Sequence, residues 1–115
     1  MSIYQDLVEA MLPSDILLFF DVVDFKKEQD HYRIYLEEKN EVPSQYQKEH
    51  VRANGFLPEI KLQDFPIRDK FLILHLKQRR WLLVKDNIKI KRDWSIAAQG
   101  TRLSKEFAAF LKELH

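Results

Sequence analysis

Apolar and polar residues alternate along several segments in the middle of the chain, and this alternation predicts strands. Residues 32–37 place Tyr, Ile and Leu on one side and Arg, Tyr and Glu on the other, as in a strand with one face in water. Residues 22–27, rich in Val and Phe, precede them across a polar turn at 28–31, so the two segments are expected to pair. A shorter strand begins at residue 60 and ends near Pro66.

The longest apolar segment, residues 70–84, contains a basic insert at 77–80. Lys-Asp-Asn follows at 85–87, and these residues are typical of a turn because Asp and Asn tolerate the left-handed backbone. A second alternating segment then covers residues 88–94. This order predicts a long antiparallel hairpin over residues 71–94, with basic residues on both arms.

Helical spacing of apolar residues is confined to the two ends of the chain. It occurs over residues 3–11, and Pro13 followed by capping residues predicts a second, short helical turn over 16–20. Near the C-terminus, Ser104 caps a helix with one apolar stripe over residues 107–114.

Residues 38–54 are the most polar segment and contain Pro43, so they are predicted to form a surface loop with a helical turn around 46–51. Together the elements predict an α+β fold: a small antiparallel sheet of four or five strands, the long basic hairpin, and helices at the N- and C-termini. The side chains expected to share its core are Ile34, Leu36, Leu72, Leu74, Leu76 and Phe110.

Composition narrows the class of protein. The chain has 115 residues, a mass of 13.9 kDa and 45% hydrophobic residues, enough for one domain over residues 1–115. The absence of cysteine excludes disulfides, thiolate zinc sites and thiol nucleophiles, and two glycines are too few for Gly-rich phosphate loops. No apolar run approaches the roughly 20 residues of a membrane span, and the first residues do not resemble a signal peptide. We therefore expect a cytoplasmic protein that has no membrane partner.

Candidate catalytic groups do not cluster along the sequence. The four histidines are scattered without the spacing of metal ligands, and no H-E-x-x-H or G-x-S-x-G motif occurs. Glu37 and Glu38 are adjacent on a predicted strand, so their side chains point to opposite faces. His75, inside the apolar run, is expected to be a structural or surface residue. The sequence therefore predicts that the chain is not an enzyme and needs no metal or cofactor.

Charge is distributed unevenly, although the net charge is only +1. Residues 1–60 carry six basic and twelve acidic side chains, a net charge of −6, and residues 61–93 carry ten basic and four acidic ones, a net charge of +6. This asymmetry favours an anionic partner for the basic part. Two oppositely charged surfaces that simply lie side by side explain it equally well. The cations of the predicted hairpin are the candidate DNA-binding residues: Lys77, Arg79, Arg80, Lys85, Lys89, Lys91 and Arg92.

Strand parity divides these cations between two faces. On the first arm, Lys77 and Arg79 share one face, whereas Arg80 lies on the other. On the return arm, Lys89 and Lys91 lie opposite Arg92. A twisted hairpin, or one inserted edge-on, is needed to bring all of them to one duplex.

Several ordered motifs give the chain a family resemblance. They are QDFPIRDK at 63–70, LHLKQRRW at 74–81, KRDW at 91–94 and AQGTR at 98–102. With these motifs the chain resembles the N-terminal region of ISAon-type bacterial insertion-sequence transposases. The opening (LP at 12–13, FD at 20–21, IYLEEKN at 34–40) and the close (EFAAFLKE at 106–113) fit the same family, so the resemblance covers nearly the whole chain. The resemblance implies a front end that binds the transposon ends, while strand transfer takes place in a separate ribonuclease-H-like domain.

A more distant likeness is to related transposases that begin with a zinc ribbon. Their pattern D-x-P-I-x-x-K followed by L-x-L-x-x-R-R occurs here between Asp64 and Arg80, but residues 82–87 lack the Cys-x-x-Cys knuckle. In those relatives, zinc stabilises a small domain. Here we expect hydrophobic packing of the hairpin arms and flanking helices to replace that contribution.

Duplex DNA is the partner that the basic hairpin and the resemblance favour, since a two-stranded ribbon fits into a major groove. Trp81 and Trp94 are candidates for base stacking, although Trp more often buries most of its area. The alternative is a protein-interaction module. In that case, the acidic and basic surfaces bind the catalytic transposase polypeptide or a second copy of the chain.

Overall fold

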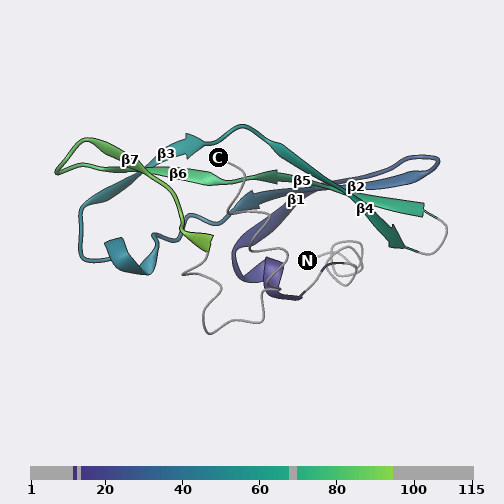
Figure 1. Cartoon of the computed structure of the whole chain (residues 1–115), viewed down its shortest axis with the longest axis horizontal. Coiled ribbons are helices and arrows are strands. Elements are labelled where there is room, and N and C mark those ends of the chain that lie inside the picture. Colours follow the sequence, from purple (N-terminus) through teal and green to yellow (C-terminus); the bar gives the residue numbers. More distant parts are fainter. Residues whose placement is uncertain (1–11, 13, 68–69, 95–115) are drawn as a thin grey trace.

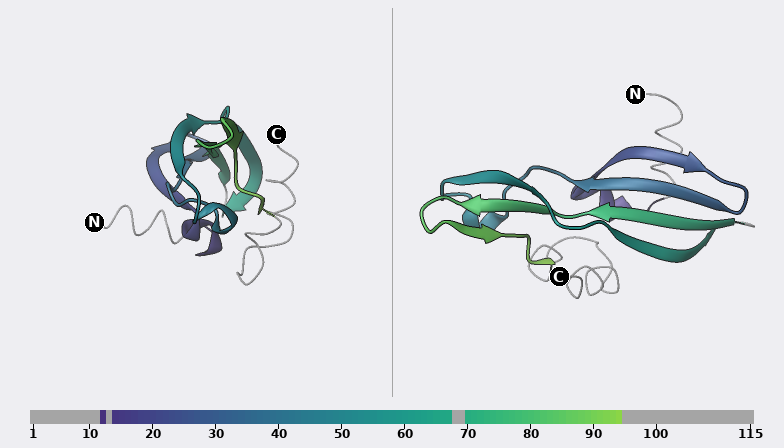
Figure 2. Two further views of the ribbon diagram at one scale, coloured as in Figure 1. Left: turned by 90° about the vertical axis from the view of Figure 1, so that its left-hand side faces the viewer. Right: turned by 90° about the horizontal axis from the view of Figure 1, so that it is seen from above.

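The computed structural model describes residue 12, residues 14–67 and residues 70–94, which form an elongated β-structure with extents of 50 × 26 × 25 Å (Figure 1). In this part of the chain, four strands form sheet A in the order β1-β2-β5-β4, and three form sheet B in the order β3-β6-β7. The two sheets lie end to end along the long axis (Figure 2). The strands are β1 (Phe20–Lys27), β2 (His31–Glu38), β3 (Val51–Phe56), β4 (Ile60–Ile67), β5 (Lys70–Lys77), β6 (Arg79–Leu83) and β7 (Ile88–Ile90).

The core lies on one face of sheet A. On its two central strands, Ile34 is in register with Leu74 and Leu36 with Leu76, and all four side chains are buried. The 3-10 helix η1 (Ser14–Leu18) packs against this face through Ile16. Five predicted core residues are thus confirmed: Ile34, Leu36, Leu72, Leu74 and Leu76. The sixth, Phe110, lies outside the described residues.

The pairing of the first two predicted strands is also confirmed. β1 and β2 are antiparallel, with Phe20 opposite Glu38 at one end and Lys27 opposite Tyr32 at the other. The helical turn predicted over 16–20 exists as η1, although it ends at Leu18.

The predicted long hairpin over residues 71–94 is wrong. β5 pairs with β2 on one side and with β4 on the other, so it has no free edge left for residues 88–94. The chain passes through Gln78 into β6, which belongs to sheet B. Only residues 81–83 pair with β7, which leaves a short hairpin around the turn at 84–87.

The prediction of one antiparallel sheet also needs correction. β2 and β5 run parallel, so sheet A is mixed, and the remaining strands form a second sheet. Alternating residues identify a strand and its buried face, but they do not identify its neighbours or their direction.

The polar segment predicted to be a loop over 38–54 ends earlier, because β3 begins at Val51. β3 pairs antiparallel with β6, and the register shifts between Ala53 and Phe56. Gly55 occupies this bulge with φ +77°, a left-handed backbone that glycine adopts without steric cost. The helical turn expected at 46–51 is instead the 3-10 helix η2 (Ser44–Tyr46).

The helices predicted near the two termini, over 3–11 and after Ser104, lie outside the described residues. What the structure shows is a mostly β protein with two short 3-10 helices in its described part, so the α+β class is not confirmed. Among the residues described, no helix is long and apolar enough to cross a membrane.

Candidate nucleic-acid interface

One face of sheet B carries three cations around an apolar side chain. Arg52 on the edge strand β3 and Lys89 on the edge strand β7 are both in register with Leu82 on the central strand β6. Side chains at register positions share a face and lie close together, and Arg80 joins them because it precedes Leu82 by two residues. We call this set, Arg52, Arg80, Leu82 and Lys89, the basic face of sheet B.

The sequence forms this face because the side chains of β6 alternate between the two sides of the sheet. Trp81 and Leu83 point to the inner face, where Trp81 is fully buried, so Arg80 and Leu82 must point outward. Neither of these outward side chains is fully exposed. The basic face is therefore the face of sheet B opposite the buried side chain of Trp81.

A hydrogen bond fixes the orientation of Arg80. Its Nε–H donates to the backbone carbonyl of Asn54, with 3.0 Å between the two heavy atoms. Asn54 directly precedes the bulge glycine, Gly55. The two terminal nitrogens of the guanidinium remain as a planar pair of donors.

The turn between β6 and β7 adds a further cation, Lys85, beyond the end of the sheet. Asn87 completes this turn in a left-handed conformation with φ 53°, as predicted for a residue type that tolerates that region. Lys85, Lys89 and Arg52 are exposed. Within the described part of the chain, none of these three forms a salt bridge, so their charges face solvent.

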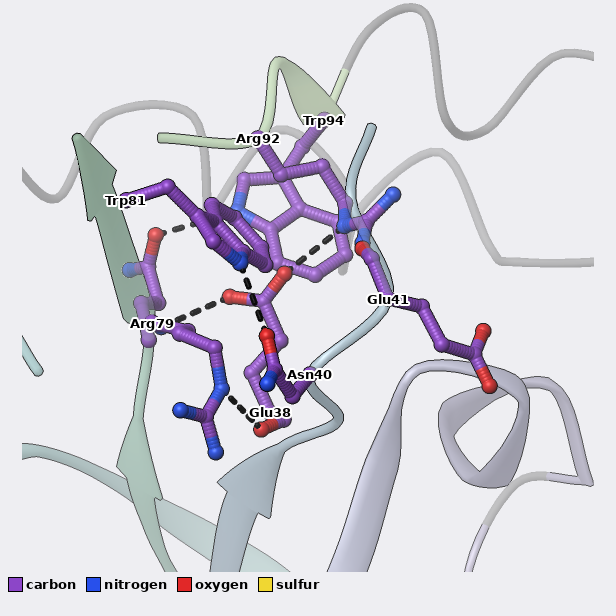
Figure 3. A network of polar contacts seen from close by, with 8 residues as sticks. Glu38, Asn40, Glu41, Arg79, Trp81, Arg92 and Trp94 are labelled. Atoms are coloured by element: carbon purple, nitrogen blue, oxygen red, sulfur yellow. Dashed lines mark hydrogen bonds and ion pairs between the residues drawn. The ribbon is translucent and has the colours of Figure 1, made fainter. Parts of the chain in front are cut away.

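Two of the predicted DNA-binding cations instead contact a buried carboxylate, Glu38 (Figure 3). The backbone N–H of Arg79 donates to Glu38 Oε1 at 2.8 Å, and its side-chain Nε donates to the Glu38 carbonyl at 3.2 Å. Arg92 Nε donates to Glu38 Oε2 at 2.7 Å. Arg92 is only 10% exposed and Glu38 only 1%. Both arginines therefore join sheet B to the end of β2, and Arg92 spends its charge on the buried carboxylate instead of presenting it to a partner.

Burial raises the pKa of Glu38 above its ordinary value, while the hydrogen bonds from Arg92 and the Arg79 backbone and the charges of both arginines act in the opposite direction. Arg92 also lies over the rings of Phe19 and Trp81, at 5.2 Å and 5.6 Å from the ring centroids. Such cation–π contacts stabilise a guanidinium that has given up most of its water. The network is a structural junction between the two sheets.

Both tryptophans belong to this junction, so neither is available for base stacking. Trp81 donates its indole N–H to Asn40 Oδ1 at 2.9 Å, and Trp94 donates its own to Gln78 Oε1 at 3.0 Å. Trp94 also stacks on Phe20, with 5.5 Å between ring centroids. The expectation that Trp buries most of its area is confirmed for both.

The last two predicted cations lie apart from the basic face. Lys77 ends β5 in sheet A, in register with Glu37 on β2, and so does not belong to sheet B. Lys91 follows β7 and is partly buried. Burial lowers the pKa of Lys91, and the nearby charge of Asp93 partly offsets this effect.

The structure therefore brings only Arg80 and Lys89 of the predicted set together on one face, with Lys85 at its tip. Arg52 is absent from the predicted set, because residues 38–54 were assigned to a loop. A weak signal was present: Val51 and Ala53 alternate with Arg52 and Asn54 ahead of a glycine, which is a short strand pattern ending in a bulge.

His75 has a structural setting, as expected. It is 4% exposed, and its ring stacks on Tyr35 with 4.2 Å between centroids. Nε2 faces Arg33 Nη1 at 3.0 Å and Nδ1 faces Glu59 Oε2 at 3.2 Å. Because arginine only donates, Nε2 accepts and Nδ1–H donates to the carboxylate. In the described part of the chain, no group of three or more His, Asp or Glu side chains is arranged to hold a metal ion.

Comparisons of the chain with protein-family models, with curated proteins and with solved structures give no match.

Proposed function

We propose that the chain binds duplex DNA through the basic face of sheet B and serves as the N-terminal, DNA-binding part of an insertion-sequence transposase. The observation that carries the proposal is the convergence of Arg52, Arg80 and Lys89 on one sheet face. No described strand position of that face holds a carboxylate. A surface with three cations and no carboxylate attracts a polyanion such as the phosphate backbone of duplex DNA.

The dimensions of sheet B suit the major groove. Its edge strands are two strand spacings apart, about 9.6 Å, and the groove is about 12 Å wide. With the sheet lying in the groove, the long side chains of Arg52 and Lys89 reach the phosphates on its two sides. Lys85, at the tip of the hairpin, extends the interface along one backbone.

The transposase role rests on the resemblance of the motifs at 63–70, 74–81, 91–94 and 98–102 to the N-terminal region of ISAon-type transposases. In this proposal the chain contacts the transposon ends, and a separate catalytic polypeptide or domain performs strand transfer. The chain itself is not an enzyme and acts without metal or cofactor. We assign its place of action to the cytoplasm, where a bacterial element meets its DNA.

The test is the salt dependence of binding, measured by fluorescence anisotropy with a labelled duplex. The double variant Arg52→Glu/Lys89→Glu is compared with Lys26→Glu/Lys27→Glu, which makes the same charge change at exposed positions of β1. Removing one cation that binds a phosphate lowers the slope of log K against log salt by about one unit. We therefore expect the slope to fall by about two units for the first variant and to change little for the second.

Equal affinity of the Arg52→Glu/Lys89→Glu variant and the wild-type chain at physiological salt would overturn the proposal. The alternative is then a module that binds the catalytic transposase polypeptide or a second copy of this chain. One observation favours it: β7 is an edge strand, and Ile88 on this strand is 52% exposed. An exposed edge with an apolar side chain is a common site for protein contacts. A mass that rises with concentration in sedimentation would support this alternative.

A further inference from the structure

The geometry of sheet B points to a division of labour in which Arg80 and Leu82 on the central strand read bases, while the edge strands position the protein on the backbone. This inference rests on the proposed DNA binding and adds to it the sequence that the face recognises. The chemical features recognised are a guanine edge and a thymine methyl group, two base pairs apart.

The place of each strand in the sheet separates the two roles. When a three-stranded sheet lies in a groove, its central strand faces the groove floor and its edge strands face the two walls. Arg52 and Lys89 are on the edge strands and Arg80 and Leu82 are on the central one. The edge cations therefore meet phosphates, which fix orientation without carrying sequence information, and the central pair meets base edges.

The hydrogen bond that holds Arg80 suits it to base recognition. Arg80 is half-buried and its Nε–H is tied to the Asn54 carbonyl at 3.0 Å, so its guanidinium has a fixed orientation on the central strand. This bond leaves the two terminal nitrogens as an oriented fork. Such a fork matches the O6 and N7 acceptors of guanine, the commonest specific arginine contact in the major groove.

The apolar side chain of Leu82 also suits a base rather than a phosphate. Its position between Arg52 and Lys89 has no use in phosphate binding, because it adds no charge to the face. In the major groove, the C5-methyl group of thymine is the apolar feature that such a side chain contacts. Leu82 therefore recognises thymine, and its neighbours shield that contact from water.

The spacing of the two residues predicts the spacing of the bases. Residues two apart on a strand are separated by about 6.7 Å, which equals two base-pair steps of about 3.4 Å. With the strand following the groove, Arg80 and Leu82 contact base pairs that have one pair between them. The expected element is G-N-T or T-N-G on one strand, or the same bases divided between the two strands.

Selection from a randomised duplex library, using the full chain, tests this inference. The variants are Arg80→Met, which keeps the length of the side chain but removes its donors to guanine, and Leu82→Gln, whose amide pairs with adenine N6 and N7. Arg52→Lys is the matched control on the edge strand. We expect the wild-type chain to enrich a guanine and a thymine two positions apart. Arg80→Met should erase the guanine, Leu82→Gln should replace the thymine by adenine, and the control should change neither.

Affinity measurements on the selected duplex provide the second readout. Replacing either recognised base pair should weaken wild-type binding about five- to 150-fold, and the salt slope should stay the same because the number of neutralised phosphates does not change. Circular dichroism melting of each variant shows whether it is folded. Because Leu82→Gln is expected to gain a new preference, a folding defect cannot imitate the expected result.

Two outcomes overturn the inference and are distinguishable. If the wild-type chain binds duplexes with a steep salt slope but enriches no sequence, or if the variants leave the enriched bases unchanged, Arg80 and Leu82 do not read bases and the proposed function survives. If the wild-type chain binds no duplex even at low salt, the proposed function and this inference fail together.

Discussion

Replacing Glu38 by Gln should strongly destabilise the protein, although the change removes only one charge and preserves shape. The Glu38 carboxylate accepts on both oxygens, from the Arg79 backbone N–H and from Arg92 Nε. A glutamine has one acceptor oxygen, and its NH₂ group would face a second donor. One of the two hydrogen bonds is therefore replaced by two N–H groups pointing at each other.

The magnitude follows from the burial of Arg92. Neutralising Glu38 removes the free-energy cost of burying its charge, which is the main cause of its raised pKa. This stabilising contribution acts against the destabilising effects. The guanidinium, however, stays 10% exposed in the folded protein and is left without its only salt-bridge partner among the described residues. The amide N–H that replaces an acceptor oxygen leaves a buried donor unpaired, which costs about 1–3 kcal/mol, so we expect the free energy of unfolding to fall by about 2 kcal/mol.

Urea denaturation followed by tryptophan fluorescence measures this decrease, because Trp81 and Trp94 lie in the same junction. Glu37→Gln is the matched control: the residue is next in sequence, less buried, and forms no salt bridge within the described part. Its effect should stay within about 0.5 kcal/mol. A decrease below about 1 kcal/mol for Glu38→Gln, set against the expected cost of an unpaired buried donor, would refute the claim that Glu38 holds the two sheets together.

Further predictions concern pH, backbone, packing and metal. Because burial raises the pKa of Glu38 above 4.5 in the folded state, the folded protein binds the Glu38 proton more tightly than the unfolded chain does. The stability of the wild-type protein relative to Glu38→Gln should therefore fall as the pH rises from 4.5 to the raised pKa of Glu38. Urea titrations across this pH range measure the decrease. Gly55→Ala should cost about 1–2 kcal/mol, because φ is +77° although nothing lies within 4 Å of the added Cβ; Gly55→Asn should cost less, and equal thermal melts for both variants would contradict the backbone explanation. Trp81→Phe should cost about 2–4 kcal/mol in urea denaturation, since it removes ring volume and the donor to Asn40. A chelator should leave the melting temperature unchanged; a drop of several degrees would show that a metal contributes to stability.

The sequence by itself determined the strands β1, β2 and β4 and the buried face of β2. The alternation in residues 32–37 is strong because every second side chain is a core leucine or isoleucine or an aromatic residue beside them, and burial follows directly from that period. The sequence also predicts the pairing of β1 with β2, because a short polar turn between two strands brings them side by side in antiparallel orientation. It also gave the turn at 85–87, whose residue types favour left-handed backbone.

Only the tertiary structure decided which strands are neighbours, and this changed the candidate site. The apolar run at 70–84 has a continuous pattern, yet Gln78 divides it between two sheets. Nothing in a local pattern shows that β5 is central or that β2 runs parallel to it, because those pairings join residues far apart in the chain.

The assignment of charges to surfaces depends on the same long-range contacts. In sequence, Arg92 and Lys89 are both candidate cations of one hairpin arm, but Arg92 lies beside a carboxylate that is 54 residues away in the chain. Lys89 lies beside Leu82 and, across the sheet, in line with Arg52. A charge becomes available to a partner only if no buried group of opposite charge reaches it, and sequence spacing does not contain that information. The sequence thus located the basic segment, and the packing of β3 and Glu38 against it decided which of its cations face solvent.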